Sequence, residues 1–168
     1  MASPYDIQTY LLDRANIQDT LTRIPIYYDT KSTEGLMKDV FAPRVEIDYT
    51  SILGGQPTHT TGEEWARTLQ PMLEAFDATQ HVYTDFLIEL PQPGQNSVRP
   101  ESCKVISHGG AHMVRNGSLL HNGGLAYFEF VRLKDLEETG LNPWRISKQK
   151  VEMAWQEGNK EVMTGIGN

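Results

Sequence analysis

The order of the hydrophobic patterns along the chain most constrains its fold, because helical spacing comes first and strand-like runs come afterwards. Over residues 7–24, apolar side chains recur at intervals of three and four residues, which is the spacing of one helical face. These side chains are Ile7, Leu11, Leu12, Ala15, Ile17, Leu21 and Ile24. Capping residues at 32–34 and 61–64 predict two further helices. Pro25 is expected to kink or interrupt the first helix, since proline removes a backbone donor. Pro71 is expected to weaken the third helix or to end its first part.

The strand-like runs begin at residues 44–51, where Val45, Ile47 and Tyr49 alternate with acidic residues, as in a half-buried strand. Longer runs rich in Val, Tyr, Phe and Ile follow at 79–90, 102–115, 119–133 and 144–155. Helices followed by long antiparallel strands predict an α+β fold with the helices on one sheet face. We therefore expect a single domain over residues 1–168, with a curved antiparallel sheet wrapped around the N-terminal helices to form a cone with an internal pocket.

Length and net charge limit the partners of such a domain. The chain has 168 residues, close to the ~150 residues of one domain. Its 15 Lys and Arg against 22 Asp and Glu give a formal net charge of −7. Nucleic acids and anionic membranes both attract basic surfaces, so we expect neither as a partner.

The sequence also bears on location and on metal binding. No apolar run reaches the ~18 residues of a membrane-spanning helix, and residues 1–6 lack the cationic start of a secretory signal, so a cytoplasmic protein is expected. A single cysteine, Cys103, excludes an internal disulfide framework and a cysteine-rich zinc site. His108 and His112 share one face of a predicted strand but lack a third ligand nearby, so we expect no metal site.

Polar residues with useful chemistry fall where the layout turns them into the cone. Tyr28 and Asp29 end the first helical segment, Tyr49 lies on the inner side of the first strand, and His81 opens the next. A histidine oriented by an aspartate is a general acid or base near neutral pH, and tyrosine hydroxyls can polarise a carbonyl. The same residues also fit a structural role, as a surface carboxylate, an edge tyrosine and a hydrogen-bonded core histidine.

Several motifs in the chain resemble a known family. They are YDTK at 28–31, FAPRVEIDYTS at 41–51, TQH at 79–81, NGG at 122–124 with Tyr127 and Glu129, and WRI at 144–146 with Trp155. In this order they resemble scytalone dehydratase and its relatives, which are SnoaL-like members of the nuclear-transport-factor-two-like superfamily of α+β cones. The resemblance covers nearly the whole chain.

The resemblance implies an active site without a cofactor. Tyr28 and Tyr49 match the tyrosines that hydrogen-bond a substrate carbonyl. Asp29 matches the carboxylate beside the catalytic histidine, and His81 matches one of the two histidines of that family. The resemblance also implies a homo-oligomer, a dimer or a trimer formed through the outer sheet face.

Other positions match the family less well. The second histidine corresponds to His112 if residues 91–100 are an insertion, whereas an alignment without gaps places Arg115 there. Leu125 and Tyr127 stand where the family has a serine and an asparagine on its substrate-binding strand, which implies a different substrate. Glu129 lies two residues after Tyr127, so it either points into the cavity and transfers protons or forms a salt bridge with an arginine on a neighbouring strand.

Three functions remain in competition. The first is a cofactor-independent lyase, a dehydratase that uses general acid–base catalysis on a small oxygenated polyketide- or terpenoid-type metabolite of secondary metabolism. The second is an isomerase, a cyclase or an epoxide-opening enzyme that uses the same cone. The third is a non-catalytic ligand-binding or dimerisation module, since a fold does not fix a function.

Overall fold

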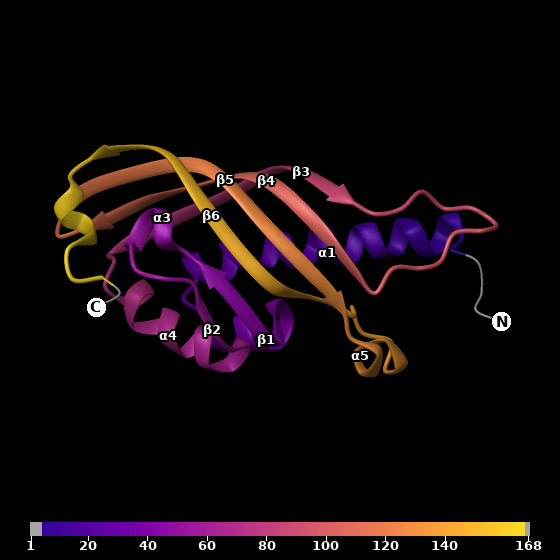
Figure 1. Ribbon diagram of the computed structural model, residues 1–168. Coiled ribbons are helices and arrows are strands. Elements are labelled where there is room, and N and C mark those ends of the chain that lie inside the picture. The colour runs from indigo at the N-terminus through magenta and orange to yellow at the C-terminus, as the bar shows by residue number, and fades with distance from the viewer. Residues whose placement is uncertain (1–4, 167–168) are drawn as a thin grey trace.

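The computed structural model describes residues 5–166, so residues 1–4 and 167–168 of the predicted domain lie outside the described part. The helices are α1 (Ile7–Asp29), α2 (Thr33–Gly35), the π-helix η1 (Leu36–Val40), α3 (Thr50–Leu53), α4 (Gly62–Glu74), α5 (Lys134–Glu138) and the 3-10 helix η2 (Lys160–Met163). The strands are β1 (Phe41–Asp48), β2 (Thr58–Thr61), β3 (Ala78–Glu89), β4 (Ser102–Arg115), β5 (Ser118–Arg132) and β6 (Trp144–Gly158). Figure 1 shows long curved strands arching over α1 and α4, which confirms the predicted α+β architecture.

The six strands form one sheet in the order β2-β1-β6-β5-β4-β3. Most neighbouring strands pair antiparallel, as predicted, but β1 pairs parallel with β6. The sheet is therefore mixed. Alternation of apolar residues predicts a strand and its buried face but not its partner, so this parallel pair could not be read from the sequence.

Helix α1 positions the first candidate residues. Asp6 caps it by accepting a hydrogen bond from the Thr9 amide at 2.7 Å. The prediction that Pro25 interrupts this helix is wrong, because α1 continues to Asp29. A proline in the last turn removes one backbone hydrogen bond, whereas Ile24 and Tyr28, on either side of it, are buried and hold the turn against the core.

Pro71 likewise does not end α4, which continues to Glu74 with its Leu69 and Leu73 buried. A capping box starts this helix: the Thr61 hydroxyl accepts from the Glu64 amide, and the Glu64 carboxylate accepts from the Thr61 amide. The apolar face of α4 therefore forms one wall of the interior.

The end of β1 differs from its prediction. The strand stops at Asp48, whose carboxylate accepts hydrogen bonds from the Thr50 amide at 3.1 Å and hydroxyl at 2.6 Å. Tyr49 thus begins the turn into α3 instead of continuing the strand. Its ring still packs inward, edge-on to Trp65 at 5.7 Å between centroids.

Within residues 5–166, the buried hydrophobic side chains form two clusters. The larger joins α1, η1 and α4 to the inner face of the sheet, through residues such as Leu21, Leu36, Phe128 and Trp144. The smaller joins the segment after β6 to the sheet and to the end of α4. Its members are Phe76, Ala111, Met113, Leu120, Val162 and Ile166. No helix within residues 5–166 is long and apolar enough to cross a membrane.

Candidate active site

The end of α1 and the start of β3 bring Asp29 and His81 together. His81 Nδ1 lies 2.7 Å from Asp29 Oδ1, and the His81 backbone amide donates to both carboxylate oxygens at 3.0 Å. The Thr79 hydroxyl donates to the same carboxylate at 2.8 Å. Because Nδ1 faces the carboxylate, it carries the proton of a neutral imidazole, and Nε2 is left as the basic nitrogen.

The ionisation of Asp29 follows from these contacts. Partial burial opposes the charged form and by itself raises the pKa of the carboxyl group. The hydrogen bonds from the His81 ring and amide and from Thr79 outweigh that effect, so the pKa of Asp29 lies below its usual value. The residue is therefore a carboxylate at neutral pH, able to stabilise a protonated His81.

Tyr28 and Tyr49 lie beside this pair. Their hydroxyl oxygens are 3.0 Å apart, and the Tyr28 ring packs edge-on against the imidazole of His81 at 5.1 Å between centroids. Burial raises the pKa of Tyr28 to about 12 and that of Tyr49 well above 10. Both are therefore neutral hydroxyl groups that can donate a hydrogen bond.

Two further polar residues near this pair, Tyr83 and Gln149, were not predicted from the sequence. Tyr83 lies two residues after His81 and shares its face of β3, so the period of two could have indicated it. Gln149 is fully buried on β6, and its Nε2 donates to the Tyr83 hydroxyl at 3.3 Å. Opposite Tyr83, Gly109 leaves room for the ring, since a Cβ there would lie 2.7 Å from it. Burial raises the pKa of Tyr83 as well.

A cavity opens against these polar groups. Its polar lining comes from Tyr28, Tyr49, His81, Tyr83 and Asn122. The remaining wall is mostly apolar side chains from α3, α4, the strands and the segment after β6, with glycines of β4 and β5 between them. The apolar members are Ile52, Leu53, Leu69, Met72, Leu73, Phe76, Ala111, Met113, Val151, Met153, Met163 and Ile166. Among the described residues, no Lys, Arg, Asp or Glu lines this cavity.

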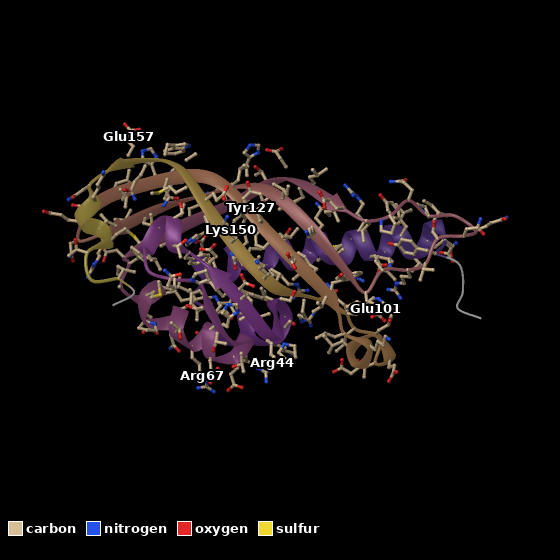
Figure 2. The ribbon with its side chains drawn as sticks, in the orientation of Figure 1. Arg44, Arg67, Glu101, Tyr127, Lys150 and Glu157 are labelled. Atoms are coloured by element: carbon tan, nitrogen blue, oxygen red, sulfur yellow. The ribbon has the colours of Figure 1, made fainter. Side chains whose placement is uncertain are left out.

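The predicted substrate-binding residues of β5 do not reach the cavity. Ala126 and Phe128 are buried in the core, so Leu125, Tyr127 and Glu129 lie on the opposite face of the sheet. Tyr127 and Glu129 line a separate groove there, each opposite a lysine of β6. Figure 2 labels Tyr127 with one of these lysines, Lys150, on the neighbouring strand. The prediction that Glu129 points into the cavity is wrong, because the burial of Phe128 and Phe130 fixes the alternation of this strand.

The two candidates for a second histidine also lie elsewhere. His112 is exposed on the outer sheet face, with its ring 5.4 Å from that of His121, because its neighbours Ala111 and Met113 face inward. Arg115 donates to the backbone oxygens of Val162 at 3.3 Å and Thr164 at 2.7 Å. Arg115 therefore holds the segment after β6 against the end of β4. Neither His112 nor Arg115 provides a second base beside His81.

Residues 5–166 contain no group of three or more His, Cys, Asp or Glu side chains placed to hold a metal ion. Cys103 is buried, and desolvation raises the pKa of its thiol to about 12. The polar lining of the cavity thus consists of the imidazole of His81, which pairs with the Asp29 carboxylate, three tyrosines and Asn122.

Comparison with known families agrees with this architecture. The family model described as a SnoaL-like domain matches residues 9–150. The chain belongs to the SnoaL-like family. The fold is that of the nuclear-transport-factor-two-like superfamily, as the resemblance in the sequence implied. A search of curated protein sequences gives no match.

Solved structures that share this fold include two that are named after an enzyme activity. A protein of Kribbella flavida is 22% identical, with a TM-score of 0.74 over 89% of this chain and 95% of that one. A candidate scytalone dehydratase from Novosphingobium aromaticivorans is 15% identical, with a TM-score of 0.69 over 90% and 91% of the two chains. The type-3 hexachlorocyclohexane dehydrochlorinase LinA of Novosphingobium barchaimii is 17% identical, with a TM-score of 0.68 over 90% and 92%. At these identities the likeness shows the fold, which members named as lyases share with this chain.

Proposed function

We propose that this SnoaL-like protein is a cofactor-independent lyase, a dehydratase in which His81 is the general base and acid and Asp29 orients and stabilises it. One observation carries the proposal: His81 lines the cavity while its Nδ1 lies 2.7 Å from the Asp29 carboxylate. This arrangement directs a basic nitrogen to an apolar interior, which is a typical geometry for proton abstraction. The names of the neighbours, a dehydratase and a dehydrochlorinase, fit the elimination of a small molecule from adjacent carbons.

The reaction follows from the positions of the groups. His81 Nε2 takes a proton from the carbon next to a substrate carbonyl, and the electron pair of that C–H bond forms an enolate. Tyrosine hydroxyls beside the imidazole hydrogen-bond the developing oxyanion, while Asp29 stabilises the imidazolium. The imidazolium then returns the proton to the hydroxyl group on the next carbon as its C–O bond breaks. One water leaves, a carbon–carbon double bond remains, and His81 is neutral again.

The lining of the cavity supports an uncharged, lipophilic substrate. A phosphate or a carboxylate would enter without a counter-charge, because none of the described lining residues is Lys or Arg. Four methionines, at 72, 113, 153 and 163, give the wall thioether side chains that adapt to irregular shapes. The cavity wall is polar near His81 and the tyrosines and apolar elsewhere. A hydrocarbon body with oxygen at one end, as in a polyketide or a terpenoid, fits this arrangement.

The test is incubation of the protein with a panel of β-hydroxy ketones, followed by mass spectrometry of the products. We expect the loss of one water from at least one ketone, and no loss with the His81→Ala variant. A product of unchanged mass would instead indicate isomerisation or cyclisation in the same cavity. If neither change occurs with any ketone of the panel, the proposal is wrong.

A further inference from the structure

Gln149 joins two of the tyrosines in an ordered way. Its side chain is fully buried (0% exposed) behind the tyrosine hydroxyls. Its Nε2 donates to Tyr83 Oη at 3.3 Å, and its Oε1 accepts from Tyr28 Oη at 3.5 Å. The side-chain amide of Gln149 has a donor nitrogen and an acceptor oxygen, so one tyrosine hydroxyl must accept from it and the other must donate to it. Tyr83 receives a hydrogen bond from Gln149, whereas Tyr28 gives one to it.

The protons of Tyr28 and Tyr49 are consequently used inside the cluster. Within the described residues, Tyr28 is the donor that reaches the buried carbonyl oxygen of Gln149, and leaving that oxygen unpaired would be costly. With its proton directed to Gln149, the Tyr28 oxygen can only accept from Tyr49, at 3.0 Å. Both hydroxyl protons are thereby engaged before a ligand arrives.

Tyr83 differs, because Gln149 donates to its oxygen and leaves its own proton unused by the amide. We propose that Tyr83 is the residue that donates the hydrogen bond to the substrate oxygen, and that Gln149 is the positioning residue that keeps the Tyr83 proton free for it. The family resemblance implied Tyr28 and Tyr49 in that role. Assigning it to Tyr83 adds a requirement to the ligand class, which is an oxygen that accepts a hydrogen bond beside Tyr83.

This inference rests on the proposed function only for the chemical step after binding. The hydrogen bond from Tyr83 can be tested by ligand binding alone. A suitable probe is 4-fluoroacetophenone, whose ketone oxygen accepts hydrogen bonds and donates none. The matched hydrocarbon is 1-ethyl-4-fluorobenzene, which has nearly the same shape and lacks the oxygen. Fluorine NMR titration gives the affinity of each, and infrared difference spectra give the carbonyl stretch of the bound ketone, which falls when a hydrogen bond forms.

We expect the wild type to prefer the ketone over the hydrocarbon by about three- to tenfold, the value of one neutral hydrogen bond. Tyr83→Phe should abolish both this preference and the lowering of the carbonyl stretch while still binding the hydrocarbon, which shows an intact cavity. Tyr28→Phe and Tyr49→Phe should keep most of the preference. Tyr27→Phe is the matched control, because the Tyr27 hydroxyl bonds Asp39 outside the cavity.

Gln149→Glu separates positioning from simple packing. A carboxylate at this position accepts from both Tyr28 and Tyr83 and so takes the Tyr83 proton, whereas a protonated carboxyl group can still donate to Tyr83. We therefore expect the variant to prefer the ketone over the hydrocarbon at low pH, as the wild type does. As the introduced carboxyl group ionises, the variant should lose this preference while the wild type at the same pH keeps it. A structural role alone would weaken both probes equally at every pH.

Three results would overturn the inference. They are equal affinities of the wild type for the two probes, a Tyr83→Phe variant that retains the carbonyl shift, and a loss of that shift in Tyr28→Phe or Tyr49→Phe instead. Each of these outcomes leaves the proposed lyase activity open, because dehydration of β-hydroxy ketones is measured separately. Conversely, a protein without turnover can still show the Tyr83-dependent preference for the ketone.

Discussion

Replacing Asp29 by asparagine removes the charge beside His81 and keeps most of the local hydrogen bonds. Oδ1 of Asp29 accepts from Thr79 and from the His81 ring and amide, whereas Oδ2 accepts only from the His81 amide. An asparagine with its oxygen at the Oδ1 position can therefore still hold the imidazole with its proton on Nδ1. The variant isolates the electrostatic support of a protonated His81.

The size of the expected rate loss follows from the burial of the Asp29–His81 pair. The side chains of His81 and Asp29 are only 17% and 26% exposed, so solvent screens their interaction incompletely. Opposite charges about 4 Å apart interact with about 4 kcal/mol in such a setting, and partial exposure reduces this to about 2–4 kcal/mol. If this energy stabilises the imidazolium in the transition state, Asp29→Asn should slow turnover by about thirtyfold to a thousandfold.

The assay is the rate of water loss from the best β-hydroxy ketone, measured together with thermal unfolding. Asp39→Asn is the matched control, because Asp39 pairs with Arg23 away from the cavity. The double variant of Asp29→Asn and His81→Ala should be no slower than His81→Ala alone, since Asp29 acts through His81. An Asp29→Asn variant that folds normally and works within about threefold of the wild type would refute the reasoning.

Further predictions concern stability and the wall of the cavity. Asp13 is fully buried and paired with Arg99, so Asp13→Ala should lower the free energy of unfolding in urea by about 3–5 kcal/mol. Arg115→Ala should free residues 160–166, raising KM and speeding their hydrogen exchange, and unchanged exchange would contradict the role given to Arg115. The folded-state pKa of Asp29 lies below its unfolded value of about 3.9, so its contribution to stability is present above that pH and lost as pH falls through the folded value. The stability difference between the wild type and Asp29→Asn, measured by denaturation at several pH values, should shrink as the pH falls below about 4.

The order of elements was predictable because periodicity is a local property. Helical spacing before Asp29 and alternation after Ala78 are visible in any short window of the sequence, and both survive in the fold. The pairing of β1 with β6 joins residues about a hundred positions apart, and no local pattern encodes it. Pro25 and Pro71 show that a local pattern can also mislead. Proline disfavours a helix interior, but burial of the neighbouring residues keeps both helices intact.

The residues of the candidate site likewise fall into those that the sequence could indicate and those that it could not. The resemblance pointed to Asp29 and His81 together, and the structure places them within hydrogen-bonding distance, although their catalytic roles remain predictions. Tyr83 could have been found as the inner-face neighbour of His81 on one strand. Gln149 could not, because its role depends on two hydroxyl groups contributed by α1 and β3.

The faces of β5 change the argument about the substrate. Leu125 and Tyr127 suggested a different substrate because they replace polar residues of the related family, yet both lie outside the cavity. Asn122 of β5 does line the cavity, and its Oδ1 accepts from the Ala111 amide at 3.2 Å. It precedes a bulge between Gly123 and Gly124. A Cβ at Gly124 would lie 2.0 Å from the backbone oxygen of Glu152, so the bulge requires glycine there. If the proposed function is correct, we therefore expect substrate choice to depend on residues that line the cavity, such as Asn122 and Tyr83, and not on Leu125 and Tyr127.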